Sequence, residues 1–217
     1  MKHHPKKDEM RPDVLIEALS ISAEKAYRWV SHLSLAMRLY EINNTKRQSA
    51  FLSNVWYESE HLERTSVELR GIPPRRIQAM WPTLFHTIEE ARPFSGLGHG
   101  LANQVFANCN GNGDYASGDG FRFRPRGLIP LCGRRAYERA SLALEFDFIG
   151  QPDRLAEDHW AALSAGWFWQ DESLNELADK DEIDAITNIL DRRHLTDGRP
   201  NLHEIHVAYR EMLQVLK

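Results

Sequence analysis

Residues 111–137 read GNGDYASGDGFRFRPRGLIPLCGRRAY, and this stretch decides which fold the sequence predicts. Its first half alternates glycines with asparagine, aspartate and serine. Glycine accepts positive φ and short polar side chains bond their own backbone, so the pattern predicts a long ordered loop. Residues 121–124 then alternate apolar and cationic side chains with the period of a β-strand that has one buried face. The stretch therefore predicts an ordered loop followed by a strand.

Arginines are concentrated in and just after this stretch. Guanidinium groups bind carboxylates and other anions through planar sets of N–H donors. We therefore expect the aromatic side chains to hold the backbone, while the arginines form the wall of a groove for a polar or anionic ligand. The arginines concerned are Arg122, Arg124, Arg126, Arg134, Arg135 and Arg139.

The remainder of the sequence is predominantly helical in pattern. Ser22 is placed to cap a helix that runs to Ile42, and Thr45 and Gln48 form a T-x-x-Q capping box for the next helix, residues 46–64. Apolar periodicity predicts further helices over residues 12–20, 75–80, 101–107, 133–144, 156–170, 174–178, 181–190 and 201–216, and residues 87–92 form another short segment.

The predicted helix 46–64 carries a glutamate beside its apolar stripe. At about 100° per residue, Phe51, Val55, Glu58 and Leu62 fall within one narrow arc. An apolar surrounding favours the protonated carboxyl group, which is the form that a general acid requires. Periodicity alone favours the alternative, in which Glu58 lies at the edge of the stripe and its carboxylate reaches water.

The stretch GNGD..SGDGFRFRPRGLIPLCGRRAY resembles the signature GNGD..SGDGW.YRGRGLIQLTGR.NY of family 19 glycoside hydrolases, particularly the phage endolysin and bacterial chitinase-like branch. The resemblance extends over about residues 12–190. It implies a mainly α (α+β), lysozyme-like fold, with a two-lobed helical domain, a small β-hairpin and a central cleft. It also implies cleavage of β-1,4 bonds in peptidoglycan, or in chitin, by an inverting mechanism that uses two carboxylates.

The resemblance also implies roles for individual residues. Tyr57-Glu58-Ser59 matches the family's H-E-S, with tyrosine in place of histidine, which makes Glu58 the general acid. Val67-Glu68-Leu69 matches a V-E-N-L-like segment if one residue is inserted, which makes Glu68 the base. Glu60 and Glu63 are the competing candidates for the base.

Further site residues follow from the same alignment. Cys132 stands at the position of the family's water-positioning threonine, and the alternative for Cys132 is a buried small apolar residue. Arg126 matches the R-G-R-G motif and is expected to orient the acid or bind sugar. The expected substrate-binding residues are Tyr57, Arg122, Arg124, Arg126 and Tyr137.

Five positions of the expected cleft depart from the family pattern. Pro125, Pro130, Cys132, Ala136 and Leu190 stand where the family has glycine, glutamine, threonine and two asparagines. Most of these changes remove polar groups that contact sugar or water in the family. A second hypothesis is therefore a noncatalytic glycan- or partner-binding relative.

The sequence favours no metal or cofactor. The polar side chains between Asn108 and Asp119 have the approximate spacing of a calcium loop, but they carry too few carboxylates for tight binding. His194, His203 and His206 do not form the H-E-x-x-H zinc pattern. Two cysteines, Cys109 and Cys132, make no disulfide framework, although a single bridge between them stays open.

Composition sets the remaining expectations. The 217 residues, 42% of them hydrophobic, with a net charge of −4, predict a flexible tail over residues 1–11 and a single soluble domain over residues 12–217. We expect a monomer that binds a polysaccharide and no nucleic acid, and no membrane span. Because no signal peptide is apparent, we expect synthesis in the cytoplasm and delivery to the cell wall by another factor.

Overall fold

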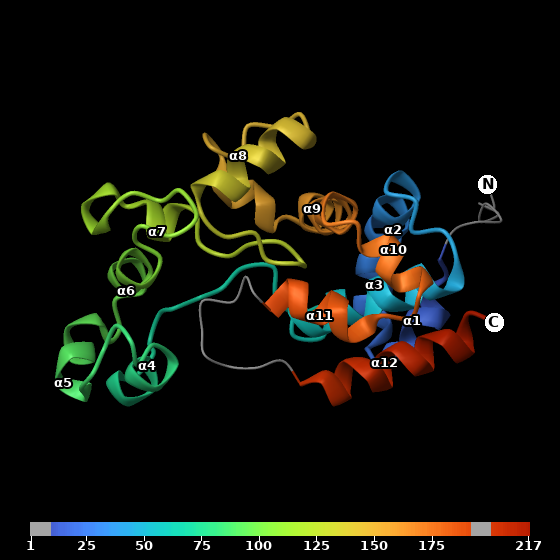
Figure 1. The fold of residues 1–217 in the computed structure, drawn as a ribbon, viewed down its shortest axis with the longest axis horizontal. Coiled ribbons are helices and arrows are strands. Elements are labelled where there is room, and N and C mark those ends of the chain that lie inside the picture. Colours follow the sequence, from blue (N-terminus) through green and yellow to red (C-terminus); the bar gives the residue numbers. More distant parts are fainter. Residues whose placement is uncertain (1–9, 192–200) are drawn as a thin grey trace.

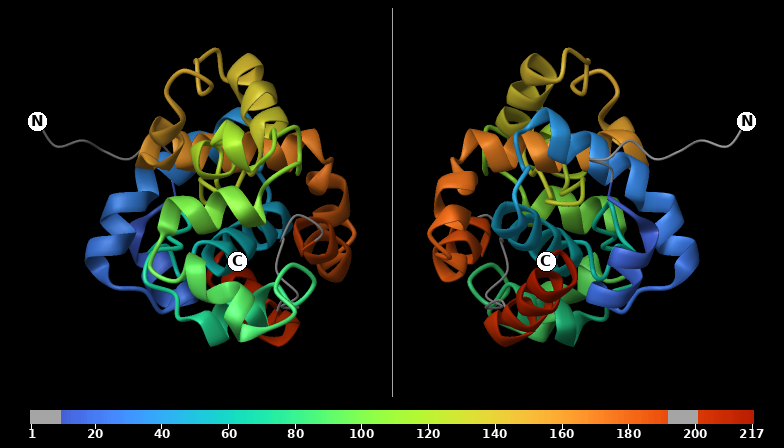
Figure 2. Two further views of the ribbon diagram at one scale, coloured as in Figure 1. Left: turned by 90° about the vertical axis from the view of Figure 1, so that its left-hand side faces the viewer. Right: turned by 90° about the vertical axis from the view of Figure 1, so that its right-hand side faces the viewer.

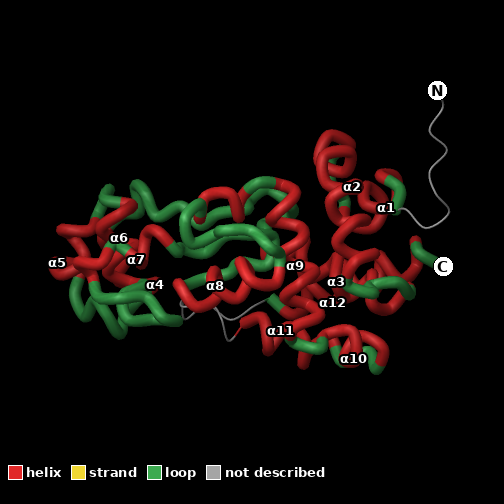
Figure 3. The backbone as a smooth tube through the Cα atoms, turned by 90° about the horizontal axis from the view of Figure 1, so that it is seen from above, coloured by secondary structure: helices red, strands yellow, loops and turns green. Residues whose placement is uncertain are grey.

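The computed structural model describes residues 10–191 and 201–217. This described part consists of α-helices, short 3₁₀ helices and loops, without a β-strand, as the backbone trace in Figure 3 shows. The predicted mainly α fold is therefore confirmed. Within the same ranges, no helix combines the length and the apolar character needed to cross a membrane. Of the predicted tail, residues 1–9 lie outside the described residues, and the first helix begins at Pro12.

Helices make up most of the described residues. In chain order they are α1 (Pro12–Leu19), α2 (Ala23–Leu39), α3 (Thr45–Glu58), α4 (Pro74–Met80), α5 (Ile88–Ala91), η1 (Arg92–Phe94), α6 (Gly98–Val105), η2 (Tyr115–Ser117), α7 (Asp119–Arg122), α8 (Arg134–Ala143), η3 (Pro152–Ala156), α9 (Asp158–Asp171), α10 (Leu174–Asp179), α11 (Ile183–Asp191) and α12 (Leu202–Val215).

The apolar side chains form two separate clusters, and these define two lobes. The large lobe comprises α1–α3 and α8–α12, and α12 packs against α3 while α2 packs against α9 (Figure 1). The small lobe comprises α4–α6, and it faces the viewer in the left-hand view of Figure 2. The chain crosses between the lobes after α3 and again between α7 and α8. A cleft between these lobes is the arrangement that the resemblance implied.

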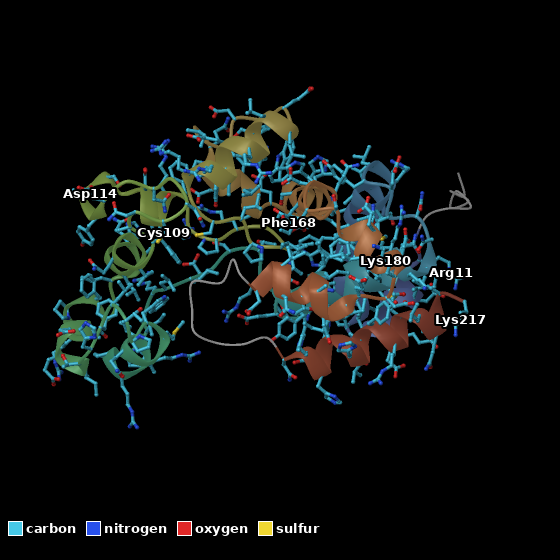
Figure 4. The ribbon with its side chains drawn as sticks, viewed as in Figure 1. Arg11, Cys109, Asp114, Phe168, Lys180 and Lys217 are labelled. Carbon is cyan, nitrogen blue, oxygen red and sulfur yellow. The ribbon has the colours of Figure 1, made fainter. Side chains whose placement is uncertain are left out.

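The aromatic residues of α9 belong to the core of the large lobe, as the helical spacing of the sequence predicted. Trp169 is fully buried, its indole N–H donates to Asn175 Oδ1 at 3.1 Å, and its ring meets Phe51 edge to face. Phe168, labelled in Figure 4, is also buried. Gly166 permits the close approach of α2, because a Cβ there would lie 2.5 Å from the Tyr40 ring.

Two predicted helix boundaries need correction. Ser22 caps α2 as predicted, with its side chain accepting from the Lys25 N–H. The cap of α3 is Asn44 rather than Thr45, because the Asn44 side chain accepts a hydrogen bond from the Arg47 N–H. Helix α3 then ends at Glu58 instead of continuing to about Arg64. Leu62 is buried as predicted, but it reaches the core from a turn and not from the helix.

The predicted β-hairpin is wrong for the described residues. Residues 119–122 form α7, and the nearest β-structure consists of two isolated antiparallel bridges from Arg126, to Ser66 and to Leu131. The alternation that predicted a strand has another cause. Phe123 is buried in the cluster of the large lobe, whereas Phe121 packs against the cluster of the small lobe. A short helix between two cores satisfies this pattern as well as a strand would.

The glycine-rich loop is held together by Asp119. Its carboxylate accepts hydrogen bonds from the Gly113 N–H at 3.0 Å and from the Arg134 guanidinium at 2.7 and 3.0 Å. Burial acts to raise the pKa of Asp119, but the hydrogen bonds from Arg134 and Gly113 outweigh it, and the pKa lies below its usual value. The prediction of an ordered loop is confirmed, because both carboxylate oxygens of Asp119 accept hydrogen bonds that tie the loop to Arg134.

Both cysteines, and two of the three histidines considered above as metal ligands, lie within the described residues. His206 lies 2.6 Å from Asp184, while His194 lies outside the described residues. Cys109, labelled in Figure 4, and Cys132 are both present as thiols. Among the described residues, no three His, Cys, Asp or Glu side chains are grouped as metal ligands.

Gly120 is the residue that lets α7 pack on α6. A Cβ at this position would lie 2.4 Å from the Ala102 carbonyl oxygen and 2.7 Å from Asn103 Cα, and both are backbone atoms of α6. We predict that Gly120→Ala lowers the free energy of unfolding by about 1–3 kcal/mol, as overpacking does, measured by chemical denaturation.

Gly100→Ala is the matched control, because a Cβ there meets its nearest neighbour at 3.4 Å, an ordinary contact, inside helix α6. This variant is expected to be neutral or to gain up to about 1 kcal/mol from helix propensity. Equal stability of the two variants would contradict the packing assigned to Gly120.

Candidate active site

A cavity of about 810 Å³ lies where the two lobes meet. Its lining includes Ile129 and Leu190 from the large cluster and Trp81 and Phe106 from the neighbourhood of the small cluster. Cavities of this size are typical of ligand sites, which also favour the junction between structural units. The cavity is therefore the candidate site for chemistry.

Both carboxylates predicted for catalysis line this one cavity. Glu58 is the last residue of α3 and is partly buried, whereas Glu68 lies on the segment that leads to α4, with 68% of its side chain exposed. Glu60 also lines the cavity, but its carboxylate pairs with Arg64. Glu63, the other competing candidate, forms a salt bridge with Lys25 and does not belong to the lining.

The segment that carries Glu68 pairs with the segment that carries the arginines. The Val67 N–H donates to the Pro125 carbonyl at 3.0 Å, and the Gly127 N–H donates to the Thr65 carbonyl at 2.9 Å. Together with the bridge between Ser66 and Arg126, these bonds join residues 65–67 to residues 125–127. The pairing fixes the backbone immediately before Glu68.

Arg124 is the charged partner of Glu68. Its Nη2 atom lies 3.6 Å from Glu68 Oε1, and only 12% of its side chain is exposed. Burial and the neighbouring Arg126 lower the pKa of Arg124. A partly buried guanidinium at this distance attracts the carboxylate of Glu68 and limits its orientations.

Arg126 and Tyr137, both predicted to bind substrate, lie in the interior and line neither cavity. Arg126 is 1% exposed, and its Nη1 donates to the Tyr137 hydroxyl at 2.7 Å and to the Arg122 carbonyl at 2.8 Å. Its Nη2 also bonds Asp153. Tyr137 is fully buried, and its hydroxyl donates to the Arg124 carbonyl at 2.7 Å. Burial raises the pKa of Tyr137.

Hydrogen bonds from the buried Arg126 and Tyr137 side chains therefore hold the backbone of residues 122–126. Arg122 is exposed, but its guanidinium donates to the Ile149 carbonyl at 2.8 Å, and it lines neither this cavity nor the second cavity described below. Of the predicted substrate-binding residues, Tyr57 lines the main cavity and Arg124 lines the second. The tyrosine hydroxyl accepts a hydrogen bond from the Asn201 N–H at 2.7 Å.

A strained turn follows Glu58 directly. Glu60, His61 and Leu62 have φ values of 50°, 64° and 61°, in the left-handed region, and none of them is glycine. Each such residue costs roughly 1–2 kcal/mol. The turn ends α3 abruptly and leaves Glu58 at the helix terminus beside the cavity.

Three hydrogen bonds, two of them buried, hold this turn in place. The fully buried Trp29 donates its indole N–H to the Leu62 carbonyl at 3.1 Å, and Lys25 Nζ donates to the His61 carbonyl at 3.1 Å. The Leu62 N–H donates to the Ser59 hydroxyl at 3.0 Å. Strain of this kind persists where the surroundings over-determine it, which is characteristic of functional sites.

Side chains from distant parts of the chain complete the edge of the cavity. His61 stacks on Trp56 with ring centroids 4.2 Å apart, and its Nε2 lies 3.0 Å from Glu204 on α12. Arg64 and Arg76 also line the cavity. No sequence pattern marks these residues as a group, because they come from separate segments and carry no motif that links them.

The departures from the family pattern concentrate on the cavity wall. Pro125, Pro130, Cys132 and Leu190 all line the cavity, whereas Ala136 does not. Cys132 is 6% exposed and packs with the small cluster, so it is a buried small side chain that also contacts the cavity. The wall of this cavity is therefore less polar than the family pattern implies.

The left-handed turn gives a prediction about stability. Glu60→Gly is expected to be more stable than Glu60→Ala by about 1 kcal/mol, because both changes remove the exposed pair with Arg64 and only glycine accepts positive φ without strain. Urea denaturation measures the difference. The same two substitutions at Glu63, whose φ is not in the left-handed region, should rank in the opposite order. If alanine is the more stable residue at position 60, the turn is not left-handed in solution.

Comparison with known proteins supplies a partial match. No protein-family model matches the chain. A Haemophilus influenzae (strain ATCC 51907 / DSM 11121 / KW20 / Rd) protein named "Glycosyl hydrolase family 19 domain-containing protein" is 31% identical over 114 residues, which are 52% of this chain and 52% of the relative. The match thus spans about half the length of that relative. The relative is named for the same family whose signature residues 111–137 resemble.

Proposed function

We propose that this chain is a glycoside hydrolase related to family 19, which cleaves β-1,4 bonds between N-acetylated sugars. The observation that carries the proposal is the placement of Glu58 and Glu68 on the wall of one cavity between the lobes. The similarity to a relative named for a family 19 domain supports it.

The two carboxylates differ in their exposure to solvent, and this difference suits a reaction that uses one acid and one base. Glu58 is partly buried at the end of α3, which suits a general acid that delivers a proton to the oxygen of the leaving group. Glu68 is largely exposed and lies near Arg124, which suits a carboxylate that accepts a proton from water. In our proposal Glu58 is the acid and Glu68 is the base.

The proposed reaction balances with one water molecule. Glu68 removes a proton from water, the water oxygen bonds to the anomeric carbon, and the bond from that carbon to the bridging oxygen breaks. Glu58 gives its proton to the bridging oxygen, which leaves as a hydroxyl group. Attack from the face opposite the leaving group inverts the anomeric carbon. Arg124 acts by orienting Glu68.

Peptidoglycan is the preferred substrate in this proposal, ahead of chitin. The motif resembles that of the endolysin branch, and arginines flank the candidate base. Peptidoglycan bears peptides with carboxylates, whereas chitin is neutral. Charge complementarity therefore favours peptidoglycan.

A noncatalytic glycan-binding protein is the second candidate. The observation in its favour is the replacement of polar family residues by Pro130, Cys132 and Leu190 on the wall of the cavity. Without these polar groups, a sugar would still pack in the cavity, but water and the sugar hydroxyls would have fewer partners. Binding without turnover would support this candidate.

The proposal predicts separate effects of two substitutions. Glu58→Gln should reduce the release of reducing sugars from purified peptidoglycan by about 10²–10⁴-fold, the usual contribution of a general acid. Glu68→Gln should also reduce release, with binding to the polymer unchanged, because activation of water is a transition-state role. Both changes preserve the shape of the side chain.

Glu60→Gln and Glu63→Gln are the matched controls. Glu60 lines the same cavity and pairs with Arg64, and Glu63 pairs with Lys25 outside it, so neither change should alter turnover by more than a few-fold. If a folded Glu58→Gln variant keeps the parent's rate, Glu58 is not the acid. If Glu63→Gln is damaging and Glu68→Gln is silent, the base is assigned to the wrong glutamate.

A further inference from the structure

A second cavity, of about 610 Å³, adjoins the candidate active site. Both cavities are lined by residues 67–69, so this segment separates one from the other. We propose that the second cavity is a carboxylate subsite, which binds the peptide carboxylate of a glycan chain while the sugars occupy the main cavity. This inference rests on the proposed function, because it assigns the substrate of the same site.

The two cavities differ in charge. The main cavity is lined by four carboxylates and two arginines. The second cavity is lined by two arginines, Arg70 and Arg124, and by a single carboxylate, that of Glu68. An anionic group would be repelled by the main cavity and attracted by the second. The charges therefore assign neutral sugars to one cavity and an anion to the other.

The Arg124 guanidinium forms only long contacts with the carboxylates of the described residues. Its contacts with Glu68 and Asp153, at 3.6 and 3.5 Å, are longer than a strong charge-assisted hydrogen bond. Nη1 donates to the Phe121 carbonyl at 3.2 Å, and the guanidinium lies 4.3 Å from the centre of the Phe121 ring. A carboxylate in the second cavity would give this mostly buried charge a closer anionic partner.

Arg70 supplies a second cation to the wall of this cavity. It is exposed and has no hydrogen-bond or ion-pair partner among residues 10–191 and 201–217. Gly98 packs against it, because a Cβ at Gly98 would lie 3.3 Å from Arg70 Cβ. Its guanidinium is thus available to a ligand, in contrast to that of Arg64, which pairs with Glu60.

Backbone donors reinforce the positive character of this cavity. Helix α6 begins at Gly98 without a side-chain cap, and Gly98, His99 and Gly100 line the cavity. The first N–H groups of a helix have no partner within the helix and favour anions. They add to the attraction that Arg70 and Arg124 provide.

Aromatic side chains complete the subsite. His99 stacks on Phe121 with ring centroids 3.6 Å apart, so Phe121 is held between His99 and Arg124. Tyr115 is half exposed, and its hydroxyl oxygen lies 3.4 Å from the place of a Cβ on Gly100. The Tyr115 ring offers an apolar surface to the aliphatic part of a peptide.

The test measures binding in the full chain carrying Glu58→Gln, so that the polymer is not degraded during the experiment. Three insoluble polymers are compared by co-sedimentation: native peptidoglycan, peptidoglycan whose carboxylates have been amidated, and chitin. Adding Arg70→Gln should weaken binding to native peptidoglycan about threefold to tenfold, as the loss of one exposed charge-assisted contact does. Binding to amidated peptidoglycan and to chitin should not change.

Arg75→Gln is the matched control, since Arg75 is exposed on α4 and lines neither cavity. Its binding to all three polymers should equal that of the Glu58→Gln chain. Equal losses on native and amidated peptidoglycan, an equal loss with Arg75→Gln, no loss with Arg70→Gln, or no binding to native peptidoglycan would each overturn the proposal. Because turnover is not measured, an inactive parent chain would refute only the proposed hydrolysis.

Discussion

The pairing of residues 65–67 with residues 125–127 is the constraint on which the site depends. Two backbone hydrogen bonds and one bridge join these segments across the junction of the lobes. The side chain of Arg126 is buried beneath this pairing, and its guanidinium donates hydrogen bonds to Tyr137 and Asp153. Removing one partner of a buried charge is far more costly than removing an exposed pair. The network therefore fixes the loop to which the segment of Glu68 is attached.

The second carboxylate depends on a different local constraint. Glu58 belongs to α3, and the left-handed turn over residues 60–62 ends that helix at the cavity. The large lobe holds the turn through Trp29. The two glutamates are thus placed by independent means, one by a strained helix end and the other by strand-like pairing. Residues 67–69 line both cavities, one of which has four carboxylates in its wall and the other a single carboxylate, with two arginines in each.

The sequence predicted the helices well because apolar periodicity and caps are local signals. Ser22 and the aromatic residues of α9 are examples. The hairpin failed because Phe121 and Phe123 alternate between two cores, which a one-dimensional pattern does not reveal. The early end of α3 was not predictable, because no glycine or proline marks it. The left-handed turn that ends the helix is held instead by a hydrogen bond from Trp29, which lies far away in the sequence. The burial of Arg126 likewise depends on partners that no spacing indicates.

The stereochemistry of the released sugar tests the central claim most directly. The claim is that two carboxylates act on one bond, with Glu58 giving a proton to the bridging oxygen and Glu68 activating one water molecule that attacks the anomeric carbon. Proton NMR of the first turnovers on a soluble β-1,4-linked substrate distinguishes the anomers before they equilibrate. The account predicts the α-anomer as the initial product, because a single displacement by water inverts the anomeric carbon. Initial release of the β-anomer, or the absence of any new reducing end, would contradict it.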